Sequence, residues 1–168
     1  MNLILCGMMG CGKSTIGALL AKEIGYTFVD SDAVIVEKYG EIAKIFNRFG
    51  EEYFRDLETE TVKMLVQRDR QVLALGGGAV LREENVRHLK TSGRIVFLRA
   101  KKETLLPRLQ SDRERPLLQT EKSLFARLDE LLEKRAPIYE QVADFTVDVD
   151  GKIPEGIVTE IVKRIGQV

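Results

Sequence analysis

One eight-residue segment near the start of the chain restricts the fold more than any other feature. Gly7–Ser14 fits the pattern G-x-x-x-x-G-K-[ST], and it stands between an apolar run, Asn2–Cys6, and a helical pattern, Lys13–Ile24. Glycines allow successive backbone N–H groups to converge on one phosphate, and the following helix directs its positive end to the same anion. The pattern predicts a phosphate-binding loop. An ordinary glycine-rich turn is disfavoured because both flanking elements are present.

The side chains of this loop indicate a nucleotide. Lys13 would neutralise the β- and γ-phosphates, and the hydroxyl of Ser14 would be a direct ligand of Mg²⁺. The motif does not say which molecule receives the phosphoryl group. We expect the nucleotide contacts of this loop to come from Gly10, Cys11, Gly12, Lys13, Ser14 and Thr15.

The remainder of the chain alternates short apolar runs with longer helical periods. This order favours an α/β fold in which helices cover both faces of a parallel sheet. The 168 residues contain no linker or repeat, so one domain spanning 1–168 is expected. Strands are expected at 2–6, 26–29, 72–75, 95–98 and 145–149, and helices at 13–24, 33–39, 51–67, 83–89, 101–109, 123–139 and 154–165.

Composition excludes several classes of protein. The 26 basic residues equal the 26 acidic ones, so the chain lacks the basic excess that usually accompanies nucleic-acid binding. No apolar run approaches the roughly 20 residues that cross a bilayer, so no membrane contact is expected. The first residues lack the basic region of a signal peptide. Two cysteines, Cys6 and Cys11, form no disulfide framework and indicate a reducing compartment, so we expect a cytoplasmic location.

Acidic residues end the second expected strand. Asp30 and Asp32 lie where the carboxyl ends of parallel strands meet around a ligand crevice. One carboxylate would hold the metal through water, and the other would receive a proton from an acceptor hydroxyl. The alternative is that Ser31 or Asp32 caps the following helix. The residues alone favour neither reading.

Four further basic or glycine-rich features are candidates for binding a ligand. Arg55 could serve a ligand or pair with Glu51 or Glu58 on its own helix. Arg135 precedes a proline and could mark only a kinked helix end. Three consecutive glycines, Gly76–Gly78, predict a loop whose backbone approaches a ligand closely.

The fourth feature is the charged stretch 111–122, which includes Arg113 and Arg115 and lacks helical periodicity. An arginine-bearing segment that closes over the γ-phosphate suits phosphoryl transfer. A solvated surface loop is the other interpretation.

Taken together, these segments resemble the shikimate kinase family along nearly the whole chain. The resemblance implies a three-layer P-loop kinase fold of the nucleoside-monophosphate kinase type, with a five-stranded parallel sheet and a mobile lid near 111–122. An acceptor-binding helical region would occupy about 31–60. The residues that carry the resemblance are Gly7–Thr15, Asp30–Asp32, Gly50 and Glu51 with Phe54, Arg55 and Glu58, Leu75–Gly78, Arg115–Leu118, and Arg135–Asp144.

The resemblance implies ATP-dependent phosphorylation of the 3-hydroxyl of shikimate, with Mg²⁺, in the chorismate pathway to aromatic amino acids. It also implies a monomer whose partners are ATP and shikimate. Asp32 is the candidate base and hydrogen-bonds the acceptor hydroxyls, and Asp30 holds the metal through water. Together with Asp32, Lys13 and Arg115 form the expected catalytic set.

Further roles carry over by matching position. Arg55 and Arg135 would clamp the shikimate carboxylate, as rigid guanidinium forks do well. The N–H of Gly77 would bind the same substrate, flanked by Gly76 and Gly78. The remaining nucleotide contacts would come from Arg108, Arg115 and Pro154, and the acceptor pocket would be lined by Met9 and Phe54.

Other functions fit less well. A gluconate kinase would share the scaffold, but Arg55, Arg135 and the triple glycine argue against it. No second base-reading pocket supports a nucleoside-monophosphate kinase. A non-catalytic ATP sensor would be expected to lose Lys13 or Asp32, and both are present. A structural module leaves the intact phosphate-binding loop without a purpose.

Overall fold

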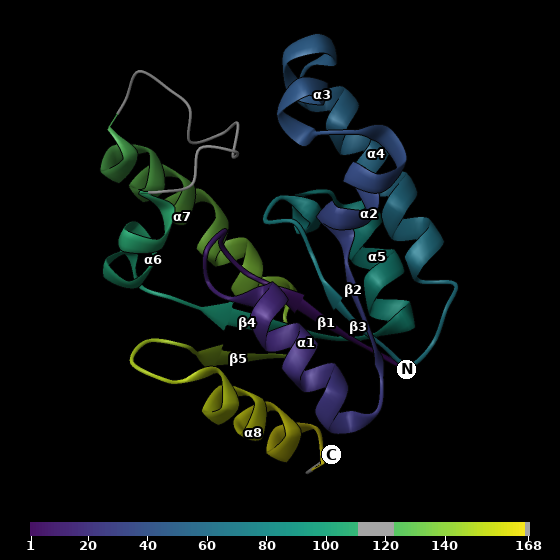
Figure 1. The fold of residues 1–168 in the computed structure, drawn as a ribbon, viewed down its shortest axis with the longest axis vertical. Helices are drawn as coiled ribbons and strands as arrows, with labels where there is room; N and C mark the ends of the chain where they lie inside the picture. The colour runs from purple at the N-terminus through teal and green to yellow at the C-terminus, as the bar shows by residue number, and fades with distance from the viewer. Residues whose placement is uncertain (111–122, 167–168) are drawn as a thin grey trace.

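The computed structural model describes residues 1–110 and 123–166. Its centre is one sheet in the order β2-β3-β1-β4-β5, in which every neighbouring pair is parallel (Figure 1). This arrangement confirms the expected α/β class. The strands are β1 (Asn2–Cys6), β2 (Thr27–Asp30), β3 (Gln71–Ala74), β4 (Gly93–Arg99) and β5 (Phe145–Asp148).

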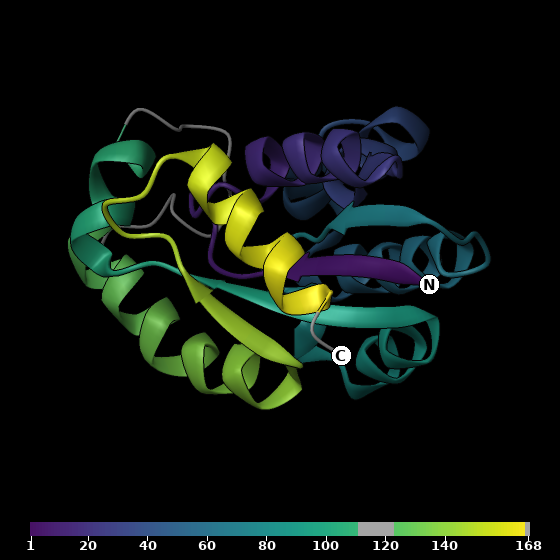
Figure 2. The same ribbon diagram turned by 90° about the horizontal axis from the view of Figure 1, so that it is seen from below.

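Helices cover the sheet on both sides and produce three layers. α1 and α8 pack together on one face, and α5 and α7 lie across β4 on the other (Figure 2). None of the helices within the described ranges is long and apolar enough to span a membrane. The helices are α1 (Lys13–Ile24), α2 (Ser31–Tyr39), α3 (Ile42–Phe49), α4 (Glu51–Leu65), α5 (Glu83–Ser92), α6 (Lys102–Leu109), α7 (Leu124–Val142) and α8 (Pro154–Ile165), with a short 3₁₀ turn, η1, at Ala79–Leu81.

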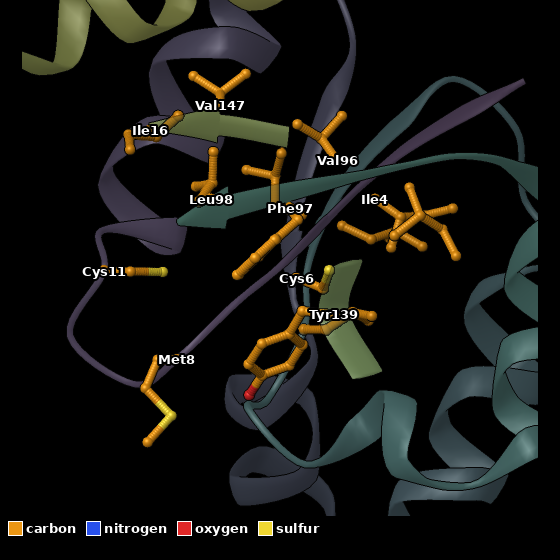
Figure 3. Close-up of a cluster of buried hydrophobic side chains, with 14 of the residues drawn as sticks. Ile4, Cys6, Met8, Cys11, Ile16, Val96, Phe97, Leu98, Tyr139 and Val147 are labelled. Carbon is orange, nitrogen blue, oxygen red and sulfur yellow. The ribbon is translucent and has the colours of Figure 1, made fainter. Parts of the chain in front are cut away.

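The central strands read as continuous apolar runs because helices bury both of their faces. Every residue of β1 and β3 is buried, including polar Asn2 and Gln71 at their starts. Both side chains make hydrogen bonds to the backbone: Asn2 Oδ1 accepts the backbone N–H of Gln71 at 2.9 Å, and Gln71 Nε2 donates to the carbonyl oxygen of Leu65 at 2.9 Å. Cys6 and Cys11 are both free and buried in this core (Figure 3). Burial raises the pKa of Cys6 to about 12.

Helices α2, α3 and α4 project from the sheet and have a small core of their own (Figure 1). Ile35, Ile45 and Phe54 contribute one buried side chain from each of these helices, separate from the main core. Phe46 packs on Phe54 with ring centroids 4.9 Å apart. This group therefore coincides with the region, about 31–60, expected to bind the acceptor.

Two local features differ from the sequence expectations. α3 was not predicted, although its apolar residues at 42, 45, 46 and 49 have helical spacing. The alternative in which Ser31 or Asp32 caps the second helix is wrong: α2 begins at Ser31, and its N-cap is Asp30. Asp30 Oδ1 accepts the N–H groups of Asp32 at 3.0 Å and Ala33 at 3.1 Å. The Ser31 hydroxyl instead accepts the N–H of Gly76 at 3.0 Å.

Candidate active site

The loop between β1 and α1 has the backbone that its glycines allow. Gly7, Gly10 and Gly12 have φ values of 147°, 81° and 102°, a region that residues with a side chain rarely adopt. Gly12 stands directly before α1, so the positive end of that helix faces the loop. The segment therefore has the backbone that a phosphate-binding loop requires.

Lys13 lies over this loop. Its Nζ donates to the carbonyl oxygens of Gly7 at 2.7 Å and Met8 at 3.0 Å. The ammonium group is thus held at the loop by backbone acceptors. A phosphate at the loop would give this cation a charged partner, which makes a stronger hydrogen bond than a neutral carbonyl does.

Ser14 and Asp30 meet at the mouth of the same loop. The hydroxyl of Ser14 donates to Asp30 Oδ2 at 2.5 Å, while Asp30 Oδ1 caps α2. A hydroxyl and a carboxylate side by side form an oxygen donor set of the kind that Mg²⁺ prefers. The described residues contain no cluster of three or more His, Cys, Asp or Glu, so a metal here would depend on nucleotide phosphates and water for its other ligands.

A cavity of about 620 Å³ opens beside the loop. It runs from the phosphate-binding loop past the ends of β2 and β3, where the strand order brings Asp32 and Gly76 together. Val36 and Ile42 add an apolar wall that was not predicted. The predicted site residues that line the cavity are Gly10, Cys11, Gly12, Lys13, Ser14, Thr15, Asp30, Asp32, Gly76, Gly77, Arg108 and Pro154.

Arg108 and Pro154 reach the cavity from two different helices, α6 and α8. Arg108 lies on α6, and its Nη1 donates to the carbonyl oxygen of Gly10 at 2.9 Å. Pro154 is the first residue of α8. Lys152 also lines the cavity and was not predicted; its Nζ pairs with Glu160 at 2.8 Å. A charged residue in the turn before α8 was the only sequence signal for it.

Arg55 is buried, with 8% of its surface exposed. Its guanidinium makes both ion pairs that the spacing allowed, with Glu58 at 2.9 Å and Glu51 at 3.3 Å. The alternative of a solvated arginine paired on its own helix is therefore confirmed in its ion pairs and wrong about solvation. The pair with Glu58 is not a solvated surface contact, because Glu58 is only 1% exposed.

Each of the three consecutive glycines leaves room for a different charged side chain. A Cβ at Gly76 would lie 2.5 Å from Asp32 Oδ1, and one at Gly77 would lie 3.2 Å from Arg135 Nη1. A Cβ at Gly78 would overlap the guanidinium of Arg55. The loop thus lets one carboxylate and two arginines from three helices approach a single stretch of backbone.

Glu58 lies at the centre of this charge cluster. Burial raises its pKa to about 7; Arg55 opposes the shift, and the nearby carboxylate of Asp32 adds to it. Its Oε2 is buried and has no hydrogen-bond partner among the described residues. From the sequence, Glu58 was recognised only as an ion-pair partner and as part of the family pattern.

Some predicted residues lie behind the cavity wall or outside the described ranges. Arg55, Gly78 and Arg135 do not line the cavity itself, and Arg135 is 4% exposed. Met9 and Phe54 are buried in the main and small cores, respectively, and their contact with an acceptor stays a prediction. Arg115 and the expected lid at 111–122 lie outside the residues that the structure describes.

A glycine-rich phosphate loop with its lysine, opening onto a cleft of small-molecule size, defines a small-molecule kinase of the P-loop class. Comparison with known proteins makes this assignment specific. The family model described as shikimate kinase matches residues 9–166. This chain belongs to the shikimate kinase family.

Relatives and a solved structure agree with the family model. The shikimate kinase of Thermodesulfovibrio yellowstonii is 47% identical, over 97% of this chain and 94% of its own length. That of Geobacter sulfurreducens is 47% identical, over 95% of this chain and 88% of its own. The structure of shikimate kinase from Acinetobacter baumannii in complex with shikimate superimposes with a TM-score of 0.95 at 38% identity, covering 99% of this chain and 93% of that one.

Proposed function

We propose that this chain transfers the γ-phosphoryl group of ATP to the 3-hydroxyl of shikimate. The observation that carries the proposal is the convergence of Asp32, Arg55 and Arg135 on the Gly76–Gly78 loop, beside a cleft that begins at the phosphate-binding loop. An acceptor with one carboxylate and several hydroxyls needs both cations and an acid group. Asp32 lines this end of the cleft, and the two arginines lie behind its wall at the Gly76–Gly78 loop.

Arg55 and Arg135 bind the carboxylate of shikimate in this proposal. Both guanidinium groups are buried, so their attraction to an anion is less weakened by water than that of a surface arginine. They approach consecutive glycines of the same loop, Arg135 at Gly77 and Arg55 at Gly78. The Glu58 carboxylate holds Arg55 in position at 2.9 Å.

Asp32 orients the acceptor hydroxyl and takes its proton. As the oxygen of the 3-hydroxyl attacks the γ-phosphorus, its O–H bond breaks and the proton moves to the Asp32 carboxylate. The bond from the γ-phosphorus to the bridging oxygen of ATP breaks, and ADP leaves. The position of Asp32 supports this role, since it lines the cavity on the first turn of α2.

The nucleotide occupies the other end of the cleft. Its phosphates lie on Gly10–Thr15, and Lys13 neutralises them. Arg108 and Pro154 contact the rest of the nucleotide. Ser14 would hold Mg²⁺ directly and Asp30 through water, and the fit of this oxygen pair supports the assignment. A bound Mg²⁺ would withdraw charge from the phosphates during transfer.

We extend the proposal to the oligomeric state, cellular location and domain organisation of the enzyme. A monomer suffices, because one chain provides every described residue of the cleft. Two free, buried cysteines and no net charge fit a cytoplasmic enzyme without a nucleic-acid partner. The chain is one domain, 1–168, in which helices 31–60 bind the acceptor, and segment 111–122 with Arg115 covers the phosphates as a lid.

A coupled assay of ADP release with MgATP tests the acceptor. Shikimate, gluconate and AMP are compared at equal concentrations. We expect release that depends on shikimate and little with the other two. Equal rates with and without shikimate would refute the proposal, and a preference for gluconate would assign the cleft to another P-loop kinase.

The clamp is tested in the same assay. Truncating either Arg55→Ala or Arg135→Ala should raise the KM for shikimate about tenfold or more, because each removes a charge-assisted bond worth about 1.5–3 kcal/mol. The KM for ATP should change little. Unchanged shikimate KM in both variants would remove the clamp from the proposal.

A further inference from the structure

Tyr139 is buried next to the acceptor site and has no role in the reaction described so far. It lies on α7 one helical turn after Arg135, so the two side chains share a face of that helix. Its hydroxyl donates to the carbonyl oxygen of Gly77 at 2.6 Å. Figure 3 shows the hydroxyl end of Tyr139 directed away from the core toward the loop that follows β3.

In the Gly76–Gly78 loop the carbonyl oxygens and the N–H groups differ in how they are hydrogen-bonded. The carbonyl oxygens are occupied: Gly76 accepts from the N–H of Ala79 at 3.0 Å, Gly77 from Tyr139, and Gly78 from the N–H of Leu81 at 3.1 Å. The N–H of Gly76 donates to Ser31 at 3.0 Å. In residues 1–110 and 123–166, nothing accepts the N–H groups of Gly77 and Gly78. Gly77 lines the cavity, so its N–H is available to a ligand there, and the N–H of Gly78, unpaired within those same ranges, belongs to a buried residue next to it.

The Tyr139 hydrogen bond controls where one of these donors points. The Gly77 carbonyl and the Gly78 N–H belong to one trans peptide plane and point in opposite directions. A peptide between two glycines rotates more easily than any other, because neither residue has a Cβ. Among the side chains of the described residues, Tyr139 makes the hydrogen bond to this peptide, at the carbonyl oxygen of Gly77, and so fixes its orientation.

Tyr139 itself is firmly held. It is 1% exposed, and its ring packs on Phe97 with centroids 5.1 Å apart. Burial raises its pKa above the ordinary value of a tyrosine, so the hydroxyl keeps its proton and remains a donor. A fixed neutral donor is suited to holding a backbone carbonyl.

We propose that Tyr139 is a positioning residue for shikimate: its hydroxyl fixes the Gly77–Gly78 peptide so that the free N–H groups face the acceptor carboxylate between Arg55 and Arg135. This inference rests on the function proposed above. Tyr139 does not touch the reacting atoms, and it acts through the backbone of the loop. Its loss should therefore weaken acceptor binding without changing nucleotide binding.

The variant Tyr139→Phe removes the hydroxyl and retains the ring. We expect the KM for shikimate to rise about tenfold, while the KM for ATP stays within about twofold. Two variants serve as controls. Phe97→Leu disturbs the ring packing without removing the hydroxyl, and should lower the unfolding temperature more than it changes the shikimate KM. Tyr26→Phe, distant from the cleft, should change neither.

A second measurement follows the loop directly. In amide NMR spectra without substrate, Tyr139→Phe should shift or broaden the Gly78 resonance and leave those of Gly10 and Gly12 in place. A lower unfolding temperature with unchanged shikimate KM and an unchanged Gly78 amide would overturn the inference. An inactive wild-type enzyme would instead refute the proposed function, and the Gly78 amide would still decide whether Tyr139 fixes the loop.

Discussion

The two ends of the cleft are built in different ways. The phosphate-binding loop is one contiguous segment, Gly7–Ser14, and most of its chemistry lies in its backbone. We call the other end the acceptor wall. It combines side chains from α2, α4 and α7 with the loop after β3, namely Asp32, Arg55, Arg135 and Gly76–Gly78.

This difference determines how each end depends on the rest of the protein. The phosphate-binding loop is set by β1 before it and α1 after it, with one added hydrogen bond from Arg108 of α6 to the carbonyl oxygen of Gly10. The acceptor wall is formed only when three helices bring buried charges to one backbone loop, and each charge relies on its neighbours for compensation. Substitutions in the wall should therefore change acceptor binding and stability together, while leaving the nucleotide end intact.

Asp32→Asn should produce the largest effect, because it removes the proposed base while keeping the shape of the side chain. We expect turnover to fall by about 10²- to 10⁴-fold, the usual contribution of a positioned base. The KM for ATP should stay within about twofold of the wild-type value. This result would show that the acceptor end can be altered without affecting nucleotide binding. The measurement is ADP release under saturating substrates.

The control for that variant is Asp56→Asn, an exposed carboxylate on α4 that pairs with Arg82 at 2.7 Å. It should leave turnover unchanged. Near-normal turnover in Asp32→Asn would mean that Asp32 only orients the hydroxyl or has no role.

Gly78→Ala should produce the next effect. The added Cβ would overlap the Arg55 guanidinium, which Glu58 and Glu51 hold in place. We expect a loss of about 1–3 kcal/mol in the free energy of unfolding, as for other overpacked sites, and a higher KM for shikimate. Chemical denaturation and steady-state kinetics measure the two changes.

Gly156→Ala is the matched control. Gly156 lies inside α8, and its nearest neighbour to an added Cβ would be Ile153 Cγ1 at 3.8 Å. Alanine there should be neutral or stabilise the protein by up to about 1 kcal/mol, because alanine favours helix. Equal effects of the two alanines would show that Arg55 does not restrict Gly78.

The same difference explains what the sequence could predict. Residues 7–14 carry their function in local spacing, so both the loop and the strand and helix around it were predicted correctly. The five strands were also predicted, because apolar runs mark buried parallel strands. The order β2-β3-β1-β4-β5 places Asp32 beside Gly76, and no local pattern contains that contact.

The acceptor wall was predictable in part. The triple glycine by itself predicted a loop that approaches a ligand closely, whereas Arg55 and Arg135 were assigned to the substrate only through the resemblance to a family. The reason for three glycines was not predictable, because it depends on side chains from other helices. The contact made by Tyr139 was not predictable either, since a tyrosine on a helix gives no sign that its hydroxyl reaches a loop 62 residues away.

Glu58→Gln should produce the smallest of these effects, visible in the pH dependence of stability. The folded pKa of Glu58, about 7, exceeds its ordinary value of 4.5, so the folded state binds this proton more tightly than the unfolded state. The resulting stabilisation is fully present below pH 4.5 and is lost as the pH rises through about 7. Glu58→Gln removes the titrating group and should flatten this part of the curve.

The measurement is chemical denaturation of the wild type and of Glu58→Gln without substrates at several values between pH 4.5 and 8. The charged groups around Glu58 are Arg55 and Glu51 on α4, Asp32 on α2 and Arg135 on α7. Glu60→Gln, an exposed neighbour on α4, is the control and should follow the wild-type curve. Parallel curves for Glu58→Gln and the wild type would show that Arg55 keeps Glu58 ionised between pH 4.5 and 8. Arg55 and Glu58 would then both be charged over that whole range.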